Sequence, residues 1–351
     1  MTISHEKALA RTIVLLLAGD DSVRAEDVVN PCLWHLAKAN QLLLAVGDMV
    51  ESRFDKQPFP APYFERYQKL KRLNAHTQTL MAELLPAFSD ADLPILTIKS
   101  FLPFPFADSN VDVVTLLPNR AQSYVDLLQK RGFEHWFNLA DWREPRKKMY
   151  GRPDWKTTDE PFPTVHLHRA ISWNGVDYLD LTAVAKRQQT RQIGNLPIPI
   201  PAPEDELLIM AAHAFFENKF ITLHELIYLE KLIQNVADWN IIFATANQYN
   251  WRSALTLFLS IAVALAKEVG LSIEIPHSLS PTSDLKVQLP FVLPVSQTYA
   301  VSWQKLGQDL QAGQWRQFPR QLFTYSFVDA AWMYRKVWRK QRRKKQAMAS
   351  C

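Results

Sequence analysis

The sequence predicts a mixed α/β (α+β) fold, in which a small mixed sheet lies between N-terminal helices and a C-terminal helical domain. Apolar residues recur at helical spacing before residue 88 and after residue 203, whereas short β-branched runs and turn residues fill the segment between them. A chain of 351 residues is long enough for two domains with buried cores. We expect helices in 1–88, an α/β domain in 89–202, a helical domain in 203–275, and a linker with a basic aromatic helix in 276–351.

The N-terminal region contains two segments with helical periodicity, Glu6–Leu17 and Asn30–Phe54. A proline-rich break follows, and leucines then recur through Phe64–Leu85 at intervals that predict a long helix. Pro86 is expected to end this helix, because proline has no backbone N–H and obstructs the preceding turn.

Two apolar runs in the middle region, Pro94–Ile98 and Val111–Leu117, predict neighbouring strands. Neither run alternates with polar residues, which is typical of strands that are covered on both faces. The prolines and short polar residues between them predict a turn. Asp112 is the one charge inside the second run, and a buried carboxylate needs a cation, a metal ion or several hydrogen-bond donors.

The rest of the middle region predicts a helix at Asn119–Gly132 and a further strand at Phe133–Phe137. Arg143–Lys156 is rich in arginine and lysine and predicts a loop or hairpin beside the sheet. Its cations would either bind a triphosphate or an acidic partner, or be solvated.

The C-terminal region begins after four alternating prolines that mark a boundary before residue 204. Helical patterns follow at Glu204–Asn235, Trp239–Ala246 and Arg252–Val269, and Gly270 predicts the end of the last helix. Pro276–Val295 is rich in serine and proline and predicts a linker.

Four short motifs follow one another in an order that indicates a family. They are Ile98-Lys99-Ser100, Asn110-Val111-Asp112, Val165-His166-Leu167-His168, and Pro203–Leu208 leading into a helix with His213. In this order they resemble the uncharacterised bacterial nucleotidyltransferase family of the polymerase-β-like superfamily, and the chain looks like a divergent member. The resemblance implies a nucleotidyltransferase-like α/β domain. It also implies metal-dependent transfer of a nucleoside monophosphate from an NTP to an acceptor hydroxyl on an unknown peptide, saccharide or protein.

The resemblance also implies roles for individual residues. The catalytic candidates are Asp112, Asn110 and His166. The nucleotide-binding candidates are Lys99, Ser100 and Ser109. The candidate ligands for Mg²⁺ or Mn²⁺ are Asp112, Asn110 and Asp108, and His168 and His213 are further candidates for the cleft.

The chain departs from the family pattern at three positions. Asn110 replaces the first of three metal-binding carboxylates, His166 replaces the third, and Ser100 replaces a glycine. Each lost carboxylate removes a negative charge, and Mg²⁺ prefers anionic oxygen ligands. Two hypotheses follow: an active enzyme in which Asp108, Asp177 or Asp180 compensates, or a catalytically degenerate binding scaffold.

Four of these side chains have a second interpretation. His166 and His168 are two residues apart, so they face the same side of a strand and with Asp112 would bind a transition metal. Lys99 would either neutralise a phosphate or pair with Asp112. His213 lies in an apolar helical segment and is either a hydrogen-bonded core residue or part of the cleft.

The charge of the chain is concentrated near its end. Eight basic residues occur between Arg335 and Lys345, and without them the formal net charge of +5 becomes −3. Interleaved aromatic residues predict an amphipathic helix that binds an anionic membrane surface or RNA, or that packs on the protein's own core. Two cysteines give no disulfide framework, and neither a signal peptide nor a membrane span is expected. We therefore expect a cytoplasmic protein, either free or peripheral at a membrane.

Overall fold

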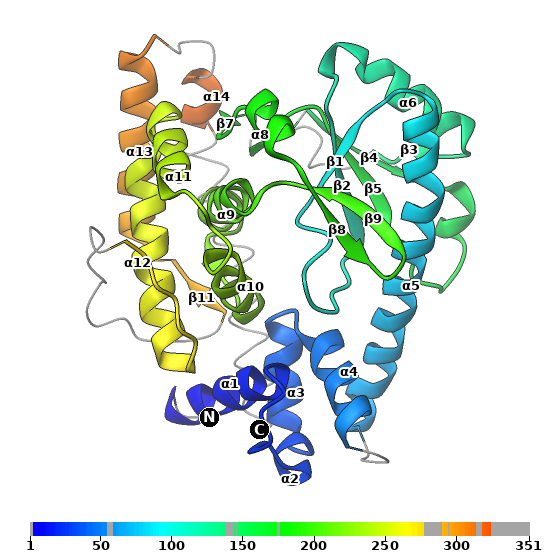
Figure 1. Ribbon diagram of the computed structural model, residues 1–351, viewed down its shortest axis with the longest axis vertical. Coiled ribbons are helices and arrows are strands. Elements are labelled where there is room, and N and C mark those ends of the chain that lie inside the picture. Colours follow the sequence, from blue (N-terminus) through cyan, green and yellow to red (C-terminus); the bar gives the residue numbers. More distant parts are fainter. Residues whose placement is uncertain are drawn as a thin grey trace. The chain divides into compact units, whose positions relative to one another are not determined.

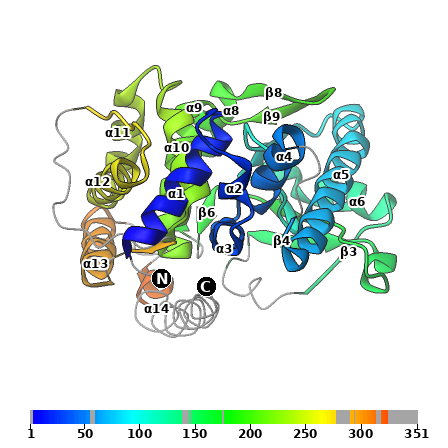
Figure 2. The same ribbon diagram turned by 90° about the horizontal axis from the view of Figure 1, so that it is seen from below.

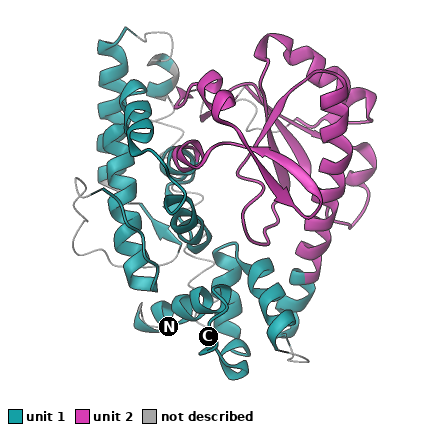
Figure 3. Ribbon diagram, in the orientation of Figure 1, with its two compact units in different colours: residues 1–67, 210–351 teal, residues 68–209 magenta. Residues whose placement is uncertain are grey.

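A computed structural model describes residues 3–54, 59–137, 144, 146–173, 176–276, 290–293, 295–313 and 318–323 (Figure 1). The chain divides into two compact units (Figure 3). The first contains residues 1–67 and 210–351, and the second contains residues 68–209. The described parts confirm the predicted class, a mixed α+β fold with helical regions on either side of the sheet in the sequence.

The N-terminal part of the first unit is helical. Its helices are α1 (Ile3–Leu17), α2 (Ala25–Val28), α3 (Pro31–Ala39), α4 (Leu43–Arg53) and the start of α5 (Ala61–Asp90). The prediction of one helix through Asn30–Phe54 is wrong, because Gln41 adopts a left-handed conformation with φ 61° and separates α3 from α4. Apolar periodicity continues across this break, so hydrophobicity alone does not reveal it.

The remaining elements of the first unit follow the α/β segment in the sequence. They are the π-helix η3 (His213–Asn218), α10 (Leu223–Ile233), α11 (Trp239–Gln248), α12 (Arg252–Val269), α13 (Val295–Gln311), α14 (Phe318–Phe323) and the paired strands β10 (Phe220–Ile221) and β11 (Phe291–Val292). The boundaries of α12 are as predicted, and Gly270 ends it with φ 84°. Among the described helices, none is both long and apolar enough to cross a membrane.

The prediction of a continuous helix through Glu204–Asn235 is wrong. Helix α9 (Pro203–Ala212) continues as the π-helix η3, which ends at Lys219 in a left-handed conformation with φ 60°. Helix α10 then starts separately, because the side chains of Thr222 and Glu225 satisfy backbone N–H groups at its N-terminus. This capping box is present in the sequence and was the signal for a new helix.

The second unit is built on a mixed sheet, which has five strands in the described part of the chain. The strands are β1 (Ile95–Ile98), β2 (Asn110–Thr115), β5 (Thr164–His168), β4 (Lys147–Gly151) and β3 (Glu134–His135), in that spatial order. The β2–β5 pair is parallel, and the other neighbours are antiparallel. In this register Asp112 pairs with Ile98 on one side and with His166 on the other.

One face of the sheet packs on the hydrophobic core of the second unit. Val111 and Val113 of β2 and Val165 and Leu167 of β5 belong to this core. The core also contains residues of α5 and α6 (Ala121–Lys130), and α5 runs beside the sheet in both views (Figure 1 and Figure 2). Because side chains alternate along a strand, the intervening residues of β2 and β5 point to the opposite face.

Two parts of the second unit differ from the expectations. Helix α5 does not stop at Pro86 but continues to Asp90, because Leu84 and Phe88 on either side of the proline are both buried in the core. Burial of these side chains outweighs the loss of one backbone hydrogen bond.

The proline-rich segment before residue 204 is not merely a boundary. It forms the hairpin of β8 (Gln189–Ile193) and β9 (Leu196–Ile200), whose Ile198 and Ile200 lie in the core. Two further short strands, β6 (Ser172–Trp173) and β7 (Val176–Asp177), precede α8 (Leu181–Arg187), and the 3-10 helices are η1 (Pro118–Arg120) and η2 (Pro153–Lys156).

Candidate functional site

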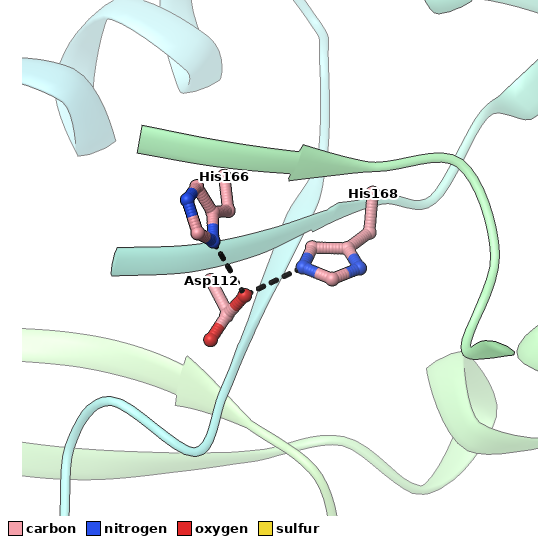
Figure 4. Close-up of side chains that lie close together, drawn as sticks. All are labelled: Asp112, His166 and His168. Carbon is pink, nitrogen blue, oxygen red and sulfur yellow. Dashed lines mark hydrogen bonds and ion pairs between the residues drawn. The ribbon is translucent and has the colours of Figure 1, made fainter. Parts of the chain in front are cut away.

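A group of polar side chains lies on the face of the sheet that points away from the core. Asp112 projects from β2, and His166 and His168 project from the adjacent parallel strand β5 (Figure 4). Their alternation with Val113 and Leu167 places all three on the same face. The side chains of Asp112 and His168 are 6% and 5% exposed, whereas that of His166 is 16% exposed.

Asp112 is the common partner of the surrounding polar groups. Its Oδ1 lies 2.6 Å from Nε2 of His168 and 3.5 Å from Nδ1 of His166. Its Oδ2 accepts a hydrogen bond from the Asn110 amide at 3.1 Å and lies 3.3 Å from Nζ of Lys99. Both carboxylate oxygens of this buried residue therefore have polar partners, as a stable buried charge requires.

The electrostatics of the group follow from these contacts. Burial by itself raises the pKa of Asp112, but the charge of Lys99 and the hydrogen bonds from His166 and His168 hold that pKa well below its usual range. Burial lowers the pKa of His168 to about 4, although Asp112 opposes this shift. At neutral pH Asp112 is therefore anionic and His168 is neutral, and the Nε2–H of His168 donates to Oδ1 of Asp112.

The turn after β1 is fixed to the start of β2. Lys99 has a left-handed backbone with φ 60°, which is uncommon for a residue with a side chain. The Ser100 hydroxyl accepts a hydrogen bond from the backbone N–H of Asp112 at 2.9 Å and donates to the Ile98 carbonyl at 3.1 Å. Ser100 thus links the two strands where Lys99 and Asp112 meet, and its predicted contact with a nucleotide stays a prediction.

Asp108 and Ser109 directly precede β2 in the sequence, and both residues are exposed. The Ser109 N–H donates to Oδ1 of Asp108 at 2.7 Å, and the Ser109 carbonyl accepts from the N–H of Thr164 at the start of β5. Desolvation of its carboxyl and the negative charge of Asp112 raise the pKa of Asp108, while Lys99 and His166 lower it. Asp108 is therefore within electrostatic reach of the site.

Other predicted residues have partners elsewhere. Asp177 pairs with Arg146 at 2.7 Å, and Asp180 accepts a hydrogen bond from the N–H of Thr182 at the start of α8. His213 belongs to the first unit, where its Nδ1 lies 3.2 Å from Nδ2 of Asn218 and its Nε2 lies 3.4 Å from Glu217. Its predicted role in the cleft stays a prediction.

Several cations of the predicted basic loop are engaged within the second unit. Arg152 pairs with Glu83 and lies over the ring of Phe133, and Lys156 lies over the ring of Trp136. Arg143 lies outside the described residues. The described contacts therefore give these cations structural roles.

Arg191 is a residue near the site that the sequence did not indicate. From β8 it donates to the carbonyl of Phe101, directly after the Lys99–Ser100 turn, and it pairs with Glu206 at 3.0 Å. It steadies the loop that carries Lys99. No sequence signal connects it to a turn 90 residues earlier.

The comparison with known families bears directly on this part of the chain. Residues 111–267 match the sequence model of a family described as uncharacterised nucleotidyltransferase. Over these residues the chain is similar to that nucleotidyltransferase family. The match begins on β2 and ends inside α12, so it includes Asp112, both histidines of β5 and His213. The predicted family resemblance is confirmed over this segment, whereas Ile98-Lys99-Ser100 and Asn110 precede the match. A search of curated proteins finds no match.

The family resemblance implies a pair of Mg²⁺ ions, and the side chains at the expected positions can be compared with the ligands that these ions need. Paired Mg²⁺ ions need several carboxylate oxygens, but here the only carboxylate among the three expected positions is Asp112. His166 pairs with Asp112 in the strand register, and the Asn110 amide nitrogen donates a hydrogen bond to the Asp112 carboxylate. In the described part of the chain, Asp112, His166 and His168 offer ligand atoms that all lie within 4.8 Å of one another. This donor set does not fit a pair of Mg²⁺ ions.

Proposed function

We propose that the protein binds an NTP beside Asp112 and transfers its nucleoside monophosphate to an acceptor hydroxyl. One observation carries the proposal: the family match begins on the strand that holds Asp112, a buried anionic carboxylate with a lysine next to it. Buried charged groups gathered on one face of a sheet are typical of functional sites rather than of cores. The acceptor would be a hydroxyl of a peptide, a saccharide or a protein.

In this reaction the acceptor oxygen forms a bond to the α-phosphorus while the bond to pyrophosphate breaks. Such transfers depend mainly on positioning and on neutralising the phosphate charge. The Lys99 side chain is 20% exposed, so its ammonium group, which lies 3.3 Å from Oδ2 of Asp112, can also contact phosphate oxygens on its solvent side. Ser100 and Arg191 hold the turn that presents this lysine.

The proposal is tested by calorimetric titration of ATP, GTP, CTP and UTP, together with measurement of pyrophosphate release. The unchanged protein should bind at least one NTP. Lys99→Met should weaken this binding by about 10- to 100-fold, because it removes a charged contact. Lys130→Met, an exposed lysine at the end of α6, is the matched control and should have no effect. Absence of NTP binding by the folded protein would refute the proposal.

A catalytically degenerate scaffold is the second candidate function. It is favoured by the single remaining carboxylate and by the number of protein groups that already satisfy it. A scaffold of this kind would bind an NTP or a partner protein without releasing pyrophosphate. Binding without turnover over a range of acceptor hydroxyls therefore favours the scaffold, and pyrophosphate release excludes it.

The cellular setting follows from the proposed substrate and stays a prediction. An NTP-dependent reaction suits the cytoplasm. The basic segment Arg335–Lys345, which predicts binding to an anionic membrane surface or RNA, lies outside the described residues.

A further inference from the structure

We propose that Asp112, His166 and His168 bind one late transition-metal ion of the Zn²⁺ class, in place of the Mg²⁺ pair implied by the family. The inference deepens the proposed function and rests on it only for the ion's role beside a nucleotide. Binding of the ion itself is a separate property, which can be measured without any NTP.

The arrangement of the three side chains is the first argument. Two imidazoles come from one strand and the carboxylate from its parallel neighbour, so all three converge on one point of the sheet (Figure 4). Zn²⁺ binds histidine nitrogen at about 2.0–2.1 Å, which separates ligand atoms in a tetrahedral site by roughly 3.3 Å. Oδ1 of Asp112 lies 2.6 Å from one imidazole nitrogen and 3.5 Å from the other. Small movements of the side chains would open space for one ion, and the proton of neutral His168 would move from Nε2 to Nδ1 so that Nε2 can bind it.

The chemistry of the donors is the second argument. Neutral imidazole nitrogen binds Zn²⁺, Co²⁺ and related ions well, whereas Mg²⁺ prefers oxygen and keeps several waters. Two histidines with one carboxylate also leave coordination positions open, as catalytic metal sites require. An open position facing solvent would accept a phosphate oxygen, and the partial exposure of His166 places that side of the group nearest solvent.

The charge balance is the third argument. Lys99 lies 3.3 Å from Oδ2 of Asp112 and offsets much of the negative charge of that carboxylate. This weakens attraction for a hard cation that depends on anionic oxygens, but it affects imidazole–metal bonds less. Lys99 and Asn110 both engage Oδ2, which leaves Oδ1 directed at the two histidines. Such contacts to the outer atom of a ligating carboxylate orient it toward a metal.

The same contacts also form a closed hydrogen-bond network that needs no metal. In that case the histidines only stabilise the buried aspartate, and mutation would change stability without changing metal content. The two possibilities differ in metal affinity, selectivity and stoichiometry.

Calorimetric titration of the full chain with Zn²⁺ alone, repeated in excess Mg²⁺, tests the inference. We expect one Zn²⁺ per chain, and excess Mg²⁺ should not displace it. His166→Ala should weaken Zn²⁺ binding by about 100-fold or more, because loss of a ligand should cost at least as much affinity as loss of a residue that hydrogen-bonds to a ligand. His135→Ala, an exposed histidine on β3, is the matched control and should retain the binding. Zn²⁺ binding that is equal in the unchanged protein and in folded His166→Ala would overturn the inference.

A second variant reverses the selectivity rather than removing the site. His166→Asp restores a carboxylate where the family has its third one, beside Asp112 in the register. We expect this variant to gain affinity for Mn²⁺ and Mg²⁺ and to lose affinity for Zn²⁺, with folding checked by circular dichroism. Unchanged metal preference in the folded variant would contradict the proposed ligand set.

Cobalt gives a spectroscopic test of the same ligands. Co²⁺ in a site with two imidazoles should show visible absorption that is absent from His168→Asn and present in His135→Ala. A protein that binds the ion in this way but binds no NTP would retain this inference and refute the proposed function, so the two claims fail separately.

Discussion

The two faces of the β2–β5 pair contrast sharply, although the same two strands form both. On one face Val111, Val113 and Leu167 pack into the core with α5 and α6. On the other, Asp112 and His168 are almost equally buried but depend on specific polar partners. Apolar packing tolerates exchange between side chains of similar volume, whereas a buried charge is stable only with its own partners. The polar face is therefore the one whose residue identities point to function.

The largest effect on stability is expected on the apolar face. Leu167→Ala should lower the free energy of unfolding by about 2–5 kcal/mol, because it leaves a cavity in the core. Denaturant unfolding measures this loss. The folded fraction should keep its Zn²⁺ affinity, since Leu167 points away from the metal-binding candidates. A folded variant that has lost Zn²⁺ binding would mean that the two faces are coupled.

The polar face should make the metal-free protein sensitive to acid. The pKa of His168 is about 4 when folded and about 6.5 when unfolded, so the unfolded chain binds more protons between these values. Stability should therefore rise with pH through this window, by up to about 3 kcal/mol, and fall on acidification. The lowered pKa of Asp112 acts in the same direction at lower pH.

Thermal unfolding with a chelator across pH 4–7 measures this effect, and His168→Asn is the variant that isolates it. The pH dependence of the variant should be shallower than that of the unchanged protein. Identical slopes would show that His168 does not carry the effect.

The smallest effect is expected at the turn that joins the two strands. Ser100→Ala removes the hydroxyl between the N–H of Asp112 and the Ile98 carbonyl and should cost about 1 kcal/mol. Ser109→Ala, at an exposed position directly before β2, is the comparison. It should change the free energy of unfolding by less than about 0.5 kcal/mol. Equal melting temperatures for the two variants would remove the structural role assigned to Ser100.

Much of the sheet was predictable because its signals are local. The β-branched run at Val111, the turn residues before it and the spacing of His166 and His168 are all visible in the sequence, and they correctly predict strands and a shared face. Family motifs added the expectation that these segments meet.

The remaining features depend on contacts between residues distant in sequence. The break at Gln41 and the continuation of α5 through Pro86 reflect packing that overrides the local pattern. The convergence of four groups on Asp112 and the support from Arg191 arise only when separate strands are brought together. One sequence can place a carboxylate on a buried strand, but it cannot show which partners surround it.

The polar face of β2 and β5 is the proposed metal and nucleotide site. The most direct test is a crystal structure of the full chain with Zn²⁺ and a non-hydrolysable NTP analogue, with anomalous data collected at the zinc edge. We expect one strong anomalous peak within bonding distance of Asp112, His166 and His168, with the triphosphate beside it and near Lys99. Crystals that contain zinc or nucleotide elsewhere, with this face unchanged and empty, would contradict it.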